Sequence, residues 1–182
     1  MKSIVFKILV LLLSVSFAYA SDESVIIGDV AMPKVESSEA FKQVRKKLGR
    51  WEGQMTQALT GKVFDVSYEW KLTSGGNTIT ERLVEDGVEM LTTYSDKNGE
   101  LVIKHYCALG TEPIFKVSSV SEETLEIRLD QDASDLHAEH ESFVTKMKWK
   151  MWESDPDKML FTNTVMLDGE PTSNSAIIKR VQ

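Results

Sequence analysis

Cysteine is nearly absent from this sequence: Cys107 is the only one among 182 residues. A single thiol cannot form a disulfide within its own chain, so side-chain packing must stabilise the fold, and any disulfide would join two molecules. Recognised catalytic motifs are also absent, and we therefore do not predict an enzyme.

Clusters of basic residues are missing as well. The chain has 21 basic and 28 acidic residues, which corresponds to a net charge of −7 at pH 7. Affinity for nucleic acids and for anionic membranes comes mainly from neutralising phosphate groups, which requires clustered lysine and arginine. We therefore expect no nucleic-acid partner.

Long apolar runs are absent except near the start of the chain, from Ile8 to Val15. Lys2 and Lys7 precede this run, and Ala18-Tyr19-Ala20 follows it with the small residues that a signal peptidase recognises. We expect residues 1–20 to be a signal peptide that directs the protein to the periplasm or out of the cell. The run is too short to span a bilayer, so no integral membrane segment is expected after its removal.

Cleavage at this point predicts a mature chain that begins at Ser21. A lipoprotein anchor would need a cysteine there, so we expect an unanchored protein. Residues 21–36 form a polar leader in which Pro33 disfavours regular structure. Residues 37–182 are then the folded domain, which is long enough to bury roughly two-thirds of its unfolded surface in a single core.

The first regular element predicted in this domain is a short amphipathic helix. Ser37 and Ser38 are suitable N-caps, because a hydroxyl accepts a hydrogen bond from a free amide of the first turn. Gly49 is a suitable stop, since glycine readily adopts the left-handed conformation that ends a helix. Three apolar residues lie between them at helical spacing: Phe41, Val44 and Leu48.

Ten later segments alternate apolar and polar residues, as strands with one dry face and one wet face do. The clearest examples are Phe64 to Lys71 and Phe143 to Met151. The ten segments are 51–59, 64–71, 78–84, 88–94, 100–108, 114–119, 125–129, 143–151, 158–167 and 175–181.

Short turn sequences separate several of these segments. They are Thr60-Gly61, Ser74-Gly75-Gly76-Asn77, Asp86-Gly87, Asn98-Gly99 and Asp168-Gly169. Such short connections indicate that successive strands pair antiparallel. Because ten strands in an open sheet leave two unpaired edges, we predict that the sheet closes. The expected fold is all-β, an up-and-down antiparallel barrel of about ten strands with a short N-terminal helix at its mouth.

A series of short motifs supports this fold. In chain order they are Leu48-Gly49-Arg50-Trp51-Glu52-Gly53, Asn98-Gly99, His105-Tyr106-Cys107, Gly110, Pro113 and Lys179-Arg180-Val181. The first resembles the motif that opens the first strand in many barrels of the lipocalin and fatty-acid-binding superfamily. The whole series resembles a family of exported bacterial proteins known only as a domain of unknown function. The resemblance implies a lipocalin-like (calycin) barrel and implies neither catalytic residues nor a cofactor.

His105 and Cys107 are candidate ligand-binding residues. They alternate with Lys104, which belongs in water, so both side chains are expected to point into the barrel. There, a neutral imidazole and a thiol could orient a ligand or hold a metal or haem. The alternative is a core histidine hydrogen-bonded to its neighbours, beside a cysteine that acts as a small apolar residue.

A charged side chain points into the barrel from segment 78–84 in either of its two possible registers. One register turns Glu81 inward, and the other turns Arg82 inward. A buried charge must be paired, reach solvent or contact a ligand. We take Arg82 as a candidate ligand contact, and the alternative is a charge at the rim, screened by water.

Three aromatic residues at inward strand positions complete the candidate site: Tyr68, Trp70 and Trp149. We interpret them as core or cavity wall rather than as a surface on which bases stack.

A separate candidate is a metal site at His137 and His140. Both lie in the acidic segment 130–141, and their spacing of three would place two imidazoles on one side of a helical turn. A solvated acidic loop has the same composition, and no recognised motif supplies a third ligand.

The leading functional hypothesis is an exported barrel that binds a small, mostly apolar or amphipathic molecule in its lumen. A second is a haem- or metal-handling barrel that resembles nitrobindin, although the glycine and proline that follow the tryptophan motif in that family are missing after Gly53. A third is an interaction protein whose barrel is completely filled by side chains.

Overall fold

The computed structural model describes residues 26–31, 36–97 and 99–181. The predicted signal peptide lies outside the described residues, as does much of the predicted leader. The leader residues that are described pair as two short strands, β1 (Ile26–Ile27) and β2 (Val30–Ala31), which the sequence reasoning did not predict.

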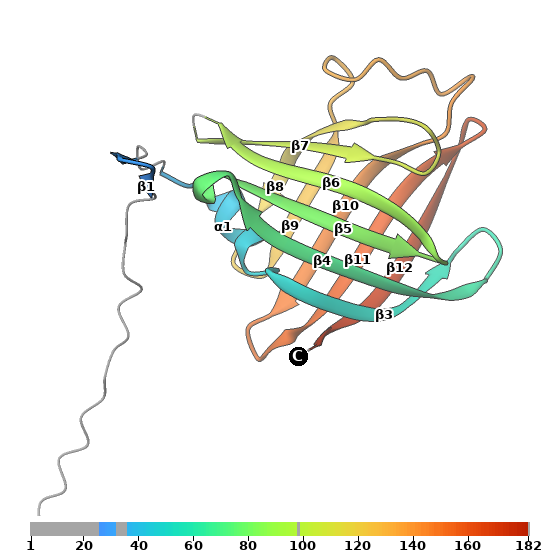
Figure 1. Cartoon of the computed structure of the whole chain (residues 1–182). Helices are drawn as coiled ribbons and strands as arrows, with labels where there is room; N and C mark the ends of the chain where they lie inside the picture. Colours follow the sequence, from blue (N-terminus) through green and yellow to red (C-terminus); the bar gives the residue numbers. More distant parts are fainter. Residues whose placement is uncertain (1–25, 32–35, 98, 182) are drawn as a thin grey trace, which may run out of the picture. The chain divides into compact units, whose positions relative to one another are not determined.

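Ten antiparallel strands form a closed barrel, as predicted (Figure 1). Each strand pairs with its neighbours in the chain, and β12 pairs with β3 to close the sheet. The strands are β3 (Gly49–Gln57), β4 (Val63–Thr73), β5 (Thr78–Glu85), β6 (Val88–Lys97), β7 (Glu100–Tyr106), β8 (Ile114–Val120), β9 (Thr124–Leu129), β10 (Phe143–Trp152), β11 (Asp155–Leu167) and β12 (Glu170–Val181). A 3₁₀ turn, η1 (Ser74–Gly76), connects β4 to β5. None of the helices described is long and apolar enough to cross a membrane.

The helix α1 (Glu39–Arg45) lies at one end of the barrel, while the β3–β4 and β5–β6 turns lie at the other (Figure 1). The Ser38 hydroxyl accepts a hydrogen bond from the Phe41 amide over 3.1 Å, as expected of an N-cap. The helix is shorter than predicted, because Gly49 does not end it. Gly49 has a φ of +107° and begins β3 instead.

Arg180 accounts for this early end. Its guanidinium group donates hydrogen bonds to the carbonyl oxygens of Lys46, over 3.0 Å, and of Leu48. These carbonyl groups therefore accept hydrogen bonds from β12 and do not need the amide groups of a longer helix as donors. The same guanidinium lies 4.3 Å from the centre of the Trp51 ring, and the Trp51 indole donates to the Lys47 carbonyl oxygen over 2.8 Å. Together these contacts close this end of the barrel.

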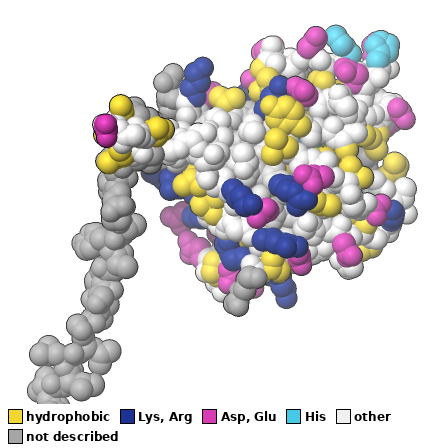
Figure 2. All heavy atoms as spheres, in the orientation of Figure 1, with side chains coloured by type: hydrophobic (Ala, Val, Ile, Leu, Met, Phe, Trp, Pro, Cys, Tyr) yellow, Lys and Arg dark blue, Asp and Glu magenta, His cyan; other side chains and the backbone are white. Residues whose placement is uncertain are grey.

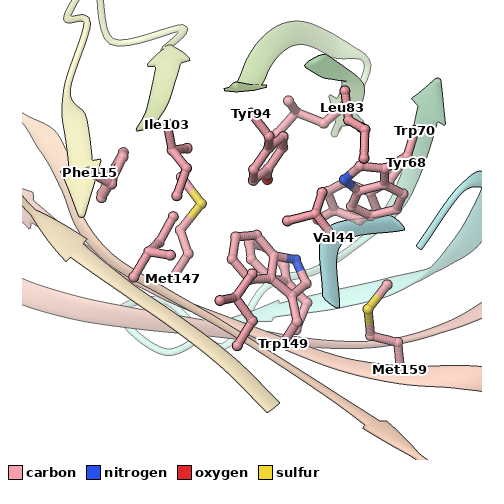
Figure 3. Packing of buried hydrophobic residues seen from close by; sticks show 14 of the residues in the cluster. Val44, Tyr68, Trp70, Leu83, Tyr94, Ile103, Phe115, Met147, Trp149 and Met159 are labelled. Atoms are coloured by element: carbon pink, nitrogen blue, oxygen red, sulfur yellow. The ribbon is translucent and has the colours of Figure 1, made fainter. Parts of the chain in front are cut away.

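The half of the barrel beneath α1 is filled by side chains. Phe41 and Val44 of the helix are fully buried, and Val44 lies among aromatic side chains of the strands (Figure 3). The aromatic rings contact one another: Trp70 stacks on Tyr68 at 5.6 Å between ring centres, and Trp51 meets Trp70 edge to face at 6.5 Å.

Candidate ligand-binding cavity

A cavity of about 380 Å³ occupies the half of the barrel opposite α1. The turns that connect β3 to β4, β5 to β6 and β7 to β8 contribute to its rim. Most of its deeper wall is apolar and consists of Phe64, Leu83, Val144, Met147, Phe161 and Val165. Polar residues make up nearly half of the lining, and they include Glu81 and Glu85 on β5 and His105 on β7.

His105 faces the lumen, as predicted, and is 2% exposed. Its Nδ1 lies 2.9 Å from the Thr92 hydroxyl on the adjacent strand β6, and its main-chain amide donates to the Pro113 carbonyl oxygen over 3.0 Å. Burial lowers the pKa of the imidazole from 6.5 to about 4, so His105 is uncharged at neutral pH. His105 is therefore a buried, hydrogen-bonded residue that also lines the cavity.

Cys107 lies at the rim, where β7 has ended, and its side chain is half-buried in the cavity wall. Its amide donates to the Thr111 carbonyl oxygen over 3.0 Å, which holds the β7–β8 loop in a turn. Burial raises the pKa of the thiol, so the thiol is protonated at neutral pH and its reactivity is low.

Of the two alternatives Glu81 and Arg82, Glu81 points into the barrel and is 2% exposed. The Tyr94 hydroxyl donates to its Oε2 over 2.5 Å. Burial raises the pKa of the carboxyl group, and the positive charge of Lys47 opposes that shift.

Arg82 does not face the lumen, which corrects its choice as a ligand contact. It lies on the outer face of β5 and pairs with Glu89 on β6. The inward register is the one that also buries Ile79 and Leu83, because two apolar side chains gain more from burial than the neighbouring threonine and valine would. The expectation of a charge screened at the rim is also wrong for Glu81, because its side chain is buried.

Lys47 is a functional candidate that the sequence reasoning missed. It is 1% exposed, and its Nζ lies 3.5 Å from the centre of the Trp149 ring. Within the described part of the chain this Nζ has no hydrogen-bond partner. Burial lowers the pKa of the ammonium group, while the charge of Glu81 opposes that shift. A signal was present, because Lys47 follows Val44 by three residues and so continues the apolar face of the helix.

Glu85 is the second carboxyl group in the cavity wall. The Tyr68 hydroxyl donates to its Oε1 over 2.8 Å, and burial raises the pKa of the carboxyl group. A third carboxylate, Asp86, lies at the rim and pairs with Lys62 over 2.5 Å.

Three other candidates, Tyr68, Trp70 and Trp149, are buried in the filled half and do not line the cavity. Their rings contact other buried aromatic rings, so they form part of the core rather than the cavity wall. Phe161 connects the two halves, because it lines the cavity and stacks on Trp149 at 5.5 Å between ring centres. A ligand would therefore meet Phe161, with the tryptophan behind it.

His137 and His140 lie in the loop between β9 and β10, where both residues are exposed. Figure 2 shows histidine side chains at the surface beside acidic ones. The His137 Nε2 lies 3.4 Å from an Asp135 carboxylate oxygen, and the His140 amide donates to the His137 carbonyl oxygen. Across residues 26–31, 36–97 and 99–181, no three His, Cys, Asp or Glu side chains are placed to hold a metal ion together.

The depressed pKa of His105 predicts a pH dependence of stability. The unfolded chain binds a proton on this imidazole below pH 6.5, whereas the folded chain does so only near pH 4. The contribution is therefore present above pH 6.5 and lost as the pH falls to 4, by about 3 kcal/mol in the free energy of unfolding.

Urea unfolding of the native protein and of His105→Asn at a series of pH values measures this contribution. Glu81 and Glu85 titrate in both proteins, so their effects cancel in the difference between the two unfolding free energies. We expect the native protein to lose stability relative to His105→Asn steadily as the pH is lowered from 6.5 to 4. A difference that stays constant over this interval would mean that the folded protein protonates His105 normally.

No protein-family model matches this sequence. No curated protein matches it either.

Solved structures with a similar fold do exist. A Nostoc punctiforme protein of unknown function from the DUF3598 family superposes with a TM-score of 0.55 at 13% sequence identity, covering 76% of this chain and 49% of the other. The chain thus spans about half the length of that protein. The M. tuberculosis protein Rv2717c superposes with a TM-score of 0.51 at 16% identity, covering 81% of this chain and 100% of the other. At these identities the similarity establishes the barrel fold alone.

Proposed function

We propose that this protein binds a small, mostly apolar molecule inside the barrel, in the cavity opposite α1. The observation that carries the proposal is the uneven filling of the lumen. Helix α1 and the aromatic side chains fill one half, whereas the other half contains a cavity of about 380 Å³. Ligand sites usually measure about 300–1,000 Å³, and apolar side chains combined with polar groups line them, as they line this cavity.

The rim of the cavity supports access from solvent. Val88 and Leu109 line the cavity and are about half exposed, at 50% and 46%. Apolar side chains at the mouth favour the entry of an apolar molecule, because contact with them removes its apolar surface from water. We propose further that the signal peptide expected at residues 1–20 directs the protein out of the cytoplasm, and that the protein binds its ligand outside the cytoplasm.

The lone thiol offers a direct test. Cys107 lines the cavity, so an occupant should shield it from alkylation by iodoacetamide, a small uncharged reagent. With octanol as the probe, at about ten times its Kd, we expect alkylation to be about tenfold slower, because only the empty fraction reacts. Mass spectrometry of the intact protein follows the reaction.

Two variants make the result specific. Val165→Trp places a large side chain in the cavity, so octanol should no longer slow the reaction of Cys107. Cys107→Ser combined with Thr56→Cys moves the thiol to an exposed position on β3, where octanol should have no effect. Alkylation of Cys107 at the same rate with and without octanol, in a folded protein, would contradict the proposal.

A further inference from the structure

We propose that the cavity selects an amphipathic molecule whose polar end is a protonated amine, rather than a fatty acid or another anion. This inference rests on the proposed ligand-binding function and names the chemical class of the ligand. It follows from the charges and the hydrogen-bonding groups that the barrel presents to the cavity.

The charges around the cavity do not balance. Three carboxyl groups line it, those of Glu81, Glu85 and Asp86. Lys62 pairs with Asp86 at the rim, and Lys47 faces Glu81 from the filled half of the barrel. Within the described residues no lysine or arginine remains for Glu85, whose only hydrogen-bond donor is the Tyr68 hydroxyl. A ligand cation beside Glu85 would supply the missing positive charge.

Other polar groups in the cavity wall are hydrogen-bond acceptors, which suit a ligand that donates hydrogen bonds. The buried Oδ1 of Asn174 accepts no hydrogen bond from the described part of the chain. His105 is uncharged, and it offers a ring nitrogen acceptor if its other nitrogen carries the proton shared with Thr92. A carboxylate contains only acceptors, so it would leave these groups without partners.

An anionic ligand would also meet unfavourable electrostatics. Lys47 does not line the cavity, and Lys62 lies at the rim, where it is already paired with Asp86. The anion would instead lie in a low-dielectric space beside two further carboxyl groups, and like charges repel strongly there. Glu85 and Glu81 would escape only by binding protons, which their raised pKa values already favour.

Three probes of the same chain length test the inference: octylamine, octanol and octanoate. Their affinities are measured by isothermal titration calorimetry at about pH 8, where an alkylamine is protonated and the ionised form of the carboxyl groups is more favoured than at lower pH. We expect octylamine to bind at least about tenfold more tightly than octanol, as a charge-assisted hydrogen bond supplies at least that factor. Octanoate is expected to bind more weakly than octanol.

Glu85→Gln removes the unbalanced charge and keeps a side chain of the same shape. In this variant the preference for octylamine over octanol should fall to less than about threefold. Glu89→Gln is the matched control, because it removes a carboxylate from the outer face of β6, and the preference should persist.

The outcomes separate the two proposals. Equal binding of octylamine and octanol by the native protein, or tighter binding of octanoate, would overturn the choice of a cationic ligand and leave the binding function intact. An octylamine preference that survives in Glu85→Gln would overturn the assigned residue. Failure of all three probes to bind would contradict the proposed function itself.

Discussion

Replacing Glu81 by leucine should lower the free energy of unfolding by about 3–5 kcal/mol, one of the largest effects expected in this protein. The substitution leaves the Lys47 ammonium group fully buried without an opposite charge. It also removes the acceptor for the Tyr94 hydroxyl, which is itself fully buried. The ammonium group and the hydroxyl would then be buried away from water without a partner in the protein.

The second arm of this experiment adds Lys47→Met to Glu81→Leu. Methionine matches the length of lysine and can pack on the Trp149 ring, so it removes the uncompensated charge at little cost in volume. We expect the double variant to be more stable than Glu81→Leu by about 1–3 kcal/mol, a coupling typical of contacting residues.

Urea unfolding at neutral pH, followed by tryptophan fluorescence, measures all four proteins of this cycle. Lys47→Met alone should cost less than Glu81→Leu alone, because the carboxyl group that remains still accepts the hydrogen bond of the Tyr94 hydroxyl. Strictly additive effects of the two substitutions would mean that Lys47 and Glu81 do not stabilise each other across the filled half of the barrel.

A second large effect is expected at Gly53, where Gly53→Val should prevent the barrel from closing. A Cβ atom added at this position would lie 2.2 Å from the Ile177 carbonyl oxygen and 3.0 Å from the Ile178 Cα. Both atoms belong to the main chain of β12, which pairs with β3 to complete the sheet. Main-chain atoms cannot move aside as a flexible side chain can, so the strands must separate.

We expect Gly53→Val to lose more than about 4 kcal/mol of stability or to be recovered only as unfolded protein. Thr56→Val is the matched control, because this residue is exposed on the same strand, and its effect should stay within about 0.5 kcal/mol. Circular dichroism and urea unfolding compare the two variants. A folded Gly53→Val protein of nearly native stability would show that β3 and β12 approach each other less closely than the structure has it.

The course of the backbone was largely predictable. Alternation along segments such as Phe143 to Met151 is a local property of an extended chain, and short turns at Asp86-Gly87 or Asp168-Gly169 make successive strands antiparallel neighbours. The inward direction of His105 followed from the same alternation, because Lys104 could not share its side of the sheet. Each of these inferences needed only residues that are close together in the sequence.

The charged residues of the lumen were less predictable. Both registers of β5 would have buried a charge, and burial of the larger apolar pair, Ile79 and Leu83, decided in favour of Glu81. Lys47 carries a charge that suits the end of a helix as well as the interior. Its burial depends on Trp149 and Glu81, which are supplied by strands distant in the chain.

The sequence by itself determined the barrel, its strand order and the side of the sheet on which His105 lies, because these follow from local periodicity and short connections. Only the tertiary structure decided that Trp70 and Trp149 fill the half beneath α1 and that a cavity remains in the other half. Filling depends on the volumes and directions of side chains from all ten strands and from the helix at once. No local sequence pattern gives this combined packing, and the chemistry proposed for the ligand depends on it.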